Sequence, residues 1–139
     1  MTQDEVVAWL QDYHDRLASA AARGESFFEE AFAKPPEGAA VHDYDARARI
    51  MRVNSEELRI LGYAREDMVG HQVWEFVVMQ DASRQSIEKK LAGEKDIKPF
   101  VRTFRRSDGS GIAMLIVDRR ILDGQGRAVG IRTAMTPVG

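Results

Sequence analysis

Apolar positions at the start of the chain recur with the spacing of a helix face. Thr2 followed by Glu5 has the form of a capping box, and the apolar residues that follow at intervals of four, three, four and three are Val6, Leu10, Tyr13, Leu17 and Ala20. This pattern predicts an amphipathic helix that ends near Gly24. A second helix, capped by Ser26 and Glu29, is predicted to end at the proline pair 35–36, because proline removes a backbone donor.

The apolar seam of the first helix has two interpretations. A heptad-like seam is typical of a contact between two copies of a chain, so we expect a homodimer interface at Val6, Leu10, Tyr13 and Leu17. The seam covers barely three heptads and is too short to hold a coiled coil by itself. The alternative is a helix packed on its own domain, and both arrangements can hold together.

From Ala39 onwards the pattern changes to short strands and turns. Strands are predicted at 41–44, 49–53, 100–106, 112–122 and 128–135, with helices at 54–62, 65–69 and 81–91 between the second and third strands. Asp108-Gly109 and Asp123-Gly124 mark two hairpins. The order predicts an α+β fold with a five-stranded antiparallel sheet and helices on one face. We divide the chain into an N-terminal helical extension, 1–38, and a domain at 39–139.

Composition narrows the classes of function. The chain has 139 residues and a formal charge of -2 with interspersed signs, so no basic face suggests a nucleic-acid partner. There is no cysteine, which excludes disulfides and thiolate metal sites. The polar, acidic start does not look like an export signal, and no run of 18 apolar residues suggests a membrane span. The expected location is the cytoplasm.

Several motifs in this order resemble the PAS domain family. The stretch 50–63 has an Asn54 cap and a closing Leu-Gly-Tyr, and 65–70 is a short acidic turn that ends in glycine. Arg105-Arg106-Ser107-Asp108-Gly109-Ser110 is similar to the family's hairpin, and 123–131 to its last hairpin and strand. The resemblance covers about residues 39–135. It implies the PAS fold, with the N-terminal amphipathic helix added in front.

The resemblance also implies a function. We expect a sensor of bacterial-type signal transduction that binds a small molecule in an internal pocket and signals through protein contacts. Its partners would be a second copy and either a separate effector protein or an effector domain outside this sequence. The alternatives are a ligand-free dimerisation scaffold and a flavin or haem redox sensor.

The sequence contains no recognisable set of catalytic residues. His14, His42 and His71 fall in three different elements without a second ligand at metal spacing. Serines occur without a nucleophile elbow, and no glycine-rich loop precedes a helix. We therefore expect no catalytic residues and no metal site.

The sequence does not identify a cofactor. Flavin photosensors that resemble this chain form their adduct on a cysteine, so covalent flavin photochemistry is excluded. Haem sensors of the family usually carry the iron-binding histidine on the long helix, and 81–91 has none, which argues against haem. A non-covalent flavin stacked on Trp74 stays compatible with the sequence, although the apolar run around Trp74 also fits a core segment.

The third strand carries the most specific candidate residue. Alternation puts Phe100, Arg102 and Phe104 on one side of the strand, which we expect to face the pocket. A buried Arg102 then anchors an anionic ligand, pairs with an acid such as Glu75, or lies at the surface in a shifted register. The predicted ligand contacts are Arg102, Phe100, Phe104, Trp74, Phe76, Met114 and Leu61.

Overall fold

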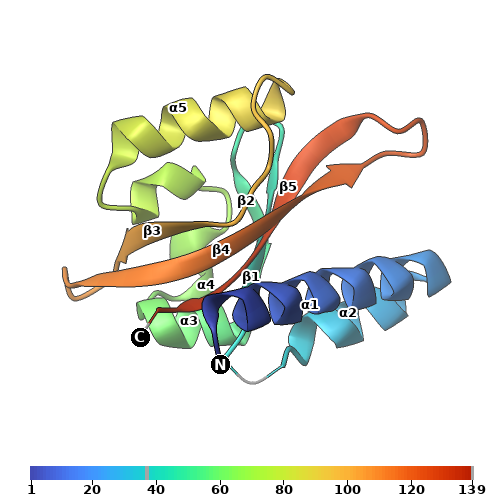
Figure 1. Ribbon diagram of the computed structural model, residues 1–139, viewed down its shortest axis with the longest axis horizontal. Coiled ribbons are helices and arrows are strands. Elements are labelled where there is room, and N and C mark those ends of the chain that lie inside the picture. Colours follow the sequence, from blue (N-terminus) through green and yellow to red (C-terminus); the bar gives the residue numbers. More distant parts are fainter. Residues whose placement is uncertain (37, 139) are drawn as a thin grey trace.

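The computed structural model describes residues 1–36 and 38–138. Its elements are α1 (Gln3–Arg23), α2 (Glu25–Ala33), β1 (Ala40–Asp45), β2 (Ile50–Val53), α3 (Ser55–Leu61), α4 (Arg65–Met68), the 3-10 turn η1 (Val73–Phe76), α5 (Gln80–Leu91), β3 (Phe100–Arg105), β4 (Gly111–Leu122) and β5 (Ala128–Pro137). The strands form one antiparallel sheet in the order β2-β1-β5-β4-β3. Figure 1 shows the sheet crossing the centre of the molecule.

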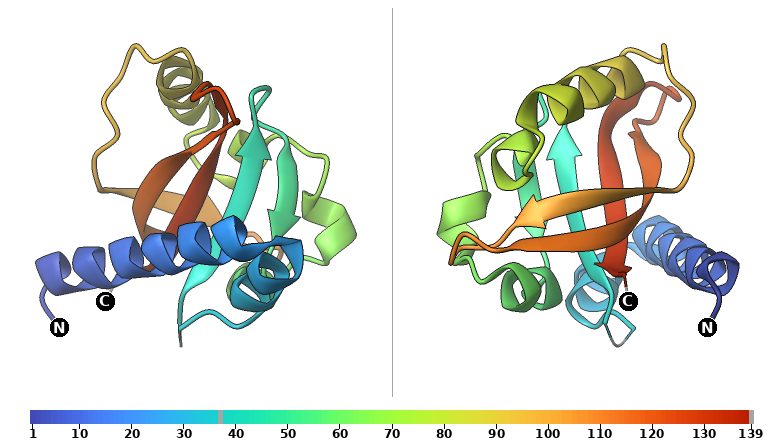
Figure 2. Two further views of the ribbon diagram at one scale, coloured as in Figure 1. Left: turned by 90° about the vertical axis from the view of Figure 1, so that its right-hand side faces the viewer. Right: turned by 60° about the vertical axis from the view of Figure 1, so that its left-hand side comes forward.

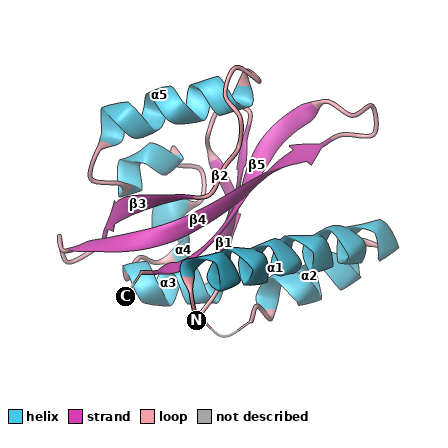
Figure 3. Cartoon of the chain, in the orientation of Figure 1, coloured by secondary structure: helices cyan, strands magenta, loops and turns pink. Residues whose placement is uncertain are grey.

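Helices cover both faces of this sheet. The helices between β2 and β3 lie on one face, which we call the inner face, as the sequence predicts. The N-terminal pair α1 and α2 covers the opposite, outer face (Figures 1 and 2). Figure 3 shows the sheet between α5 and the N-terminal pair of helices. The domain is therefore an α+β sandwich of three layers, with the PAS-like part forming the sheet and the inner layer.

Side chains alternate between the two layers along the central strands. The inner-face cluster draws on Tyr44, Ile116 and Ile131, together with residues of α3, α4 and η1. The outer-face cluster joins Val41 and Val117 of the sheet to residues of α1 and α2. Since strand neighbours point to opposite faces, the same three strands serve both cores.

The predicted seam of α1 lies against the sheet. Leu10, Tyr13 and Leu17 are buried in the outer-face cluster, whereas Val6 is half-buried at its edge. The Tyr13 hydroxyl donates to the Ala31 carbonyl at 3.3 Å and so ties α1 to α2. This packing is the second of the two interpretations of the seam. A dimer contact through the three buried residues would require α1 to leave the sheet, and that contact stays a prediction.

One histidine of α1 also docks on the sheet. The buried His14 ring donates from Nε2 to the Val117 carbonyl at 2.7 Å, and its Nδ1 has no hydrogen-bond partner among the described residues. Burial lowers the pKa of His14, a shift that its bond to Val117 opposes in part. The neutral ring is therefore the form that fits between α1 and β4.

Asn54 joins the sheet to the inner helices. Its side-chain oxygen accepts from the backbone N–H of Glu57, which caps α3, and from the N–H of Val41. Its amide donates to the Ala39 carbonyl at 3.2 Å.

Close approach of β5 to β1 requires a glycine at position 130. Any side chain at Gly130 would collide with the Tyr44 carbonyl of β1.

Two predicted helix starts differ from the structure. Helix α2 begins at Glu25 after a Gly24 cap without a side-chain hydrogen bond, so Ser26 lies inside it. Helix α5 begins at Gln80, which places Asp81 in the first turn instead of at the cap. The apolar run around Trp74 contains a short 3-10 helix. None of the described helices combines the length and the apolar character that a bilayer crossing requires.

Leu17→Ala is expected to destabilise the full chain by about 2–5 kcal/mol, because the truncation leaves a cavity under α1. Denaturant unfolding at constant protein concentration measures the loss. The exposed Gln11→Ala on the same helix is the control and should change stability by less than about 0.5 kcal/mol. Unchanged unfolding combined with a weakened dimer would show instead that a second copy covers Leu17.

Candidate ligand-binding cavity

A small cavity lies between the inner face of the sheet and α5. Its volume is about 30 Å³. This is room for one or two water molecules. Every strand of the sheet except β2 contributes to its wall, together with α5 and the segment around η1. The lining residues are His42, Tyr44, Val73, Val77, Ser83, Ser86, Ile87, Lys90, Phe100, Arg102, Phe104, Ile116, Asp118 and Thr133.

The third strand contributes the side predicted from its alternation. Phe100, Arg102 and Phe104 line the cavity, while Val101 and the residues that alternate with it are exposed. The Arg102 guanidinium lies 5.5 Å from the Phe100 ring centroid. Arg102 forms no salt bridge within residues 1–36 and 38–138, and Glu75 contacts His71 instead. The ion pair between Arg102 and Glu75, one of the alternatives predicted from the sequence, is therefore not formed.

The other four predicted ligand contacts are not among the residues that line the cavity. Leu61, Phe76 and Met114 are buried in the inner-face core, where Phe76 packs edge-on against Tyr63 at 5.0 Å between ring centroids. Trp74 is half-buried, and the Arg84 guanidinium lies 5.4 Å from its ring. A ligand in this cavity would reach Leu61, Phe76 and Met114 only by displacing core side chains, and Trp74 lines a different, open groove.

A buried acid–base pair forms part of the cavity wall. His42 Nδ1 lies 2.8 Å and 2.9 Å from the two carboxylate oxygens of Glu57, and both side chains are almost wholly removed from solvent. Burial alone would lower the pKa of His42, but the charge and hydrogen bond of Glu57 outweigh it and raise that pKa. Because a carboxylate only accepts, Nδ1 is the donor and Nε2 is the ring atom left for another partner.

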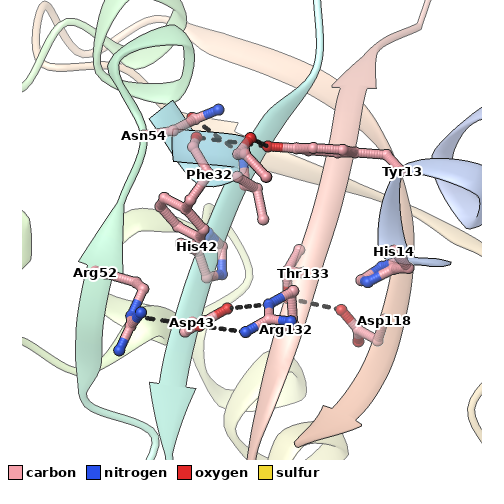
Figure 4. Close-up of polar contacts among 12 residues, drawn as sticks. Tyr13, His14, Phe32, His42, Asp43, Arg52, Asn54, Asp118, Arg132 and Thr133 are labelled. Atoms are coloured by element: carbon pink, nitrogen blue, oxygen red, sulfur yellow. Dashed lines mark hydrogen bonds and ion pairs between the residues drawn. The ribbon is translucent and has the colours of Figure 1, made fainter. Parts of the chain in front are cut away.

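A second buried pair connects α5 to the sheet. Lys90 Nζ lies 3.1 Å from one carboxylate oxygen of Asp118, and the Thr133 hydroxyl donates to the other at 2.6 Å. Figure 4 shows Thr133 and Asp118 facing each other from neighbouring strands. The same Nζ lies 3.9 Å from the Phe100 ring centroid. Burial lowers the pKa of Lys90, while Asp118 opposes that shift.

Two polar atoms of the wall have no partner within the described part of the chain. They are His42 Nε2 and the Ser83 hydroxyl oxygen, on side chains that are 1% and 3% exposed. Buried polar atoms in native proteins almost always have a hydrogen-bond partner. Both atoms lie in the cavity wall and can bond to a polar occupant such as water.

Sequence reasoning missed the most polar part of this site. Glu57 follows the Asn54 cap at the spacing of a capping box, a pattern that places a carboxylate at the helix start. In the structure the carboxylate bonds to His42 instead. Because His42 follows Val41 on β1, strand alternation predicts that the two side chains lie on opposite faces, but it does not identify the partner of His42. The pairing of Lys90 with Asp118 could not be predicted, because charged side chains are usually exposed to solvent.

Comparison with known proteins agrees with the fold. The profile of the PAS domain family matches residues 36–136, so the chain belongs to the PAS domain family, whose members are generally sensory or signalling modules. Comparison with curated proteins finds no match.

Solved PAS domains have the same fold at low sequence identity. The PAS domain of an HTR-like protein from Haloarcula marismortui is 22% identical with a TM-score of 0.67, over 92% of this chain and 99% of that one. A PAS domain from Colwellia psychrerythraea is 17% identical with a TM-score of 0.68, over 79% and 92%. The PAS-B domain of Drosophila melanogaster Cycle, solved with ethylene glycol, is 14% identical with a TM-score of 0.61, over 71% and 99%.

An NMR titration of His42 tests its pairing with Glu57. In the wild type we expect the midpoint above the ordinary value of 6.5, because Glu57 stabilises the protonated ring. In Glu57→Gln the midpoint should fall below 6.5, since burial then dominates. His14 on the other face of the sheet is the internal control and should titrate alike in both proteins. Equal His42 midpoints in both proteins would contradict the pairing.

Lys90→Met should destabilise the protein by about 3–5 kcal/mol, because it leaves the Asp118 carboxylate buried without its cation. The double variant Lys90→Met/Asp118→Asn should be less destabilised than the single variant, since the amide is neutral and still accepts from Thr133. Chemical unfolding measures all three proteins. Lys89→Met, at an exposed position of the same helix, is the control. A double variant as unstable as the single one would mean that the pair is not coupled.

Proposed function

We propose that this PAS domain is a sensor that binds a small molecule in the cavity between the sheet and α5. Ligand binding would change protein–protein contacts, and the domain would have no catalytic role. Its partners would be a second copy of the chain and an effector that receives the signal. The observation that carries the proposal is the pair of unpartnered buried atoms, His42 Nε2 and Ser83 Oγ, in the cavity wall.

Neighbouring residues of β4 and β5 connect the cavity to the outer face of the sheet. Asp118 lines the cavity, and the preceding carbonyl, of Val117, accepts from His14 of α1. Thr133 lines the cavity, and its neighbour Arg132 forms two hydrogen bonds with Asp43 on the outer face, at 2.8 Å and 2.9 Å. Figure 4 shows the bonds between Arg132 and Asp43, with His14, Asp118 and Thr133 beside them. A shift of either strand at the cavity would therefore move the contacts of α1 and α2.

Helix α5 is the wall best suited to respond to a ligand. Its buried residues are Ser83, Ser86 and Lys90, whereas the buried face of α1 carries Leu10, Tyr13 and Leu17. Two apolar residues of α5, Ile87 and Leu91, are only partly buried against the inner core, so displacing α5 would expose less apolar surface than displacing α1. We infer that α5 moves when a guest larger than one or two waters enters.

The cavity does not fit the larger cofactors of the family. Binding sites for drug-sized ligands occupy about 300–1,000 Å³. A space of about 30 Å³ admits neither a flavin ring system nor a haem without repacking of the core. The proposed ligand is accordingly small, in keeping with the ethylene glycol held by the Cycle PAS-B domain.

The same small volume favours a second candidate function. An interior that is nearly filled fits a protein-interaction scaffold that needs no ligand. In that case the cavity would hold only water bonded to His42 and Ser83. The two candidates differ in what accompanies the freshly purified protein.

Native mass spectrometry of the full chain tests the sensor. We expect a small added mass that is lost on denaturation, together with a population of two copies. Hydrogen exchange should then differ at the α1 amides around His14 between loaded and stripped protein. A bare mass in preparations from several growth conditions would support the scaffold. A bound molecule without any change at α1 would contradict the proposed route of signalling.

A further inference from the structure

The groups left in the cavity wall can donate hydrogen bonds: the guanidinium only donates, the Ser83 hydroxyl donates or accepts, and His42 Nε2 donates when the ring is protonated. Both oxygens of Asp118 are engaged, by Lys90 and Thr133, and both oxygens of Glu57 face His42. The groups that remain are the Ser83 hydroxyl, His42 Nε2 and the Arg102 guanidinium. An occupant that satisfies this wall must bring acceptors.

The charges of the wall also favour an anion. Lys90 is neutralised by Asp118, and a protonated His42 by Glu57. Arg102 has no acidic partner in the described residues and leaves one positive charge. An anionic oxygen beside Nε2 of His42 selects the doubly protonated ring, which then donates from both nitrogens. One negative charge on the guest would balance the site.

We propose that the cavity binds a short-chain monocarboxylate whose oxygens accept hydrogen bonds from His42 Nε2–H and the Ser83 hydroxyl, with Arg102 balancing the charge. This inference rests on the proposed sensory function and names its ligand class. A carboxylate offers two acceptor oxygens and no donor, as the wall requires. A primary amide of the same shape offers one acceptor oxygen and no charge to balance Arg102.

The size of the cavity limits the chain length. About 30 Å³ is filled by a few atoms, so a guest of acetate size already presses on its surroundings. The wall that gives way is α5, because its fully buried residues are polar and its apolar Ile87 and Leu91 are only partly buried. The ligand that satisfies Ser83 therefore also displaces the helix that carries it. Chain length and outward movement of α5 should increase together.

Titration of the full chain with sodium acetate and sodium propionate, followed by two-dimensional NMR, tests the inference. Acetamide and propionamide serve as neutral isosteres, and sodium chloride matches the ionic strength. We expect saturable shifts at His42, Ser83 and along α5, with the carboxylates binding about tenfold tighter than the amides. Equal binding of acid and amide, or no saturable shift with the carboxylates up to tens of millimolar, would overturn it.

Ser83→Ala separates binding from folding. The variant should weaken carboxylate binding about tenfold, because one hydrogen bond to a charged oxygen is lost. Thermal unfolding without ligand checks that the variant is folded. Ser19→Ala, at an exposed position of α1, is the matched control and should bind like the wild type. Unchanged carboxylate binding in Ser83→Ala would also overturn the inference.

The outcomes for the ligand class and for the sensory function are distinguishable. If native mass spectrometry finds a bound molecule that is not a carboxylate, the sensory proposal stands and the ligand class is wrong. If neither a co-purified molecule nor carboxylate binding is found, both proposals are wrong and the scaffold function is supported.

Discussion

The whole architecture depends on the central strands β1, β5 and β4 being buried on both faces. A strand sends successive side chains to opposite sides, so each must supply one layer with every second residue and the other layer with the rest. Val117 and Asp118 illustrate this division, one facing α1 and the other the cavity. A one-residue slip would move charged Asp118 into the apolar outer core and Val117 into the cavity wall. This constraint fixes the register of the sheet and joins the two layers mechanically.

The two layers are held by different kinds of interaction. The outer layer is mostly apolar, with Leu10 and Leu17 of α1 buried against the sheet, although Asp43 and Arg132 form an ion pair within it. The inner layer has an apolar core around α3 and η1, to which α5 adds the partly buried Ile87 and Leu91, and Lys90 of α5 pairs with Asp118 of β4. Buried ion pairs contribute little net stability, because desolvation offsets their attraction. Such contacts specify a position for α5 while leaving it easier to displace than α1.

This asymmetry connects the fold to the proposed function. PAS domains are generally sensory or signalling modules, and this chain belongs to that family. A sensor requires one wall that yields to a ligand and another that transmits the change. Here the buried residues of α5 are polar, whereas α1 buries apolar side chains on the strands that line the cavity. The hydrogen bond from His14 to the Val117 carbonyl brings α1 within one residue of the cavity wall.

Local signals in the sequence determined the elements and their order. Caps such as Thr2 and Asn54, the Asp-Gly turns and the period of the apolar residues act over a few positions, so the five strands, the inner helices and the α+β fold class could be predicted. The inward side of β3, with Arg102 between two phenylalanines, followed from alternation alone. The start of α5 was predicted wrongly because capping residues are also common within a first turn.

Only the tertiary structure decided which residues meet. His42 and Glu57 are 15 positions apart, and Lys90 and Asp118 are 28 apart, so neither pair has a local signature. The tertiary structure likewise decided that α1 covers the outer face, since an apolar seam fits a sheet as well as a second helix. The physical reason is that burial is not directional: hydrophobic spacing says that a face must be covered, and the arrangement of the whole chain selects what covers it.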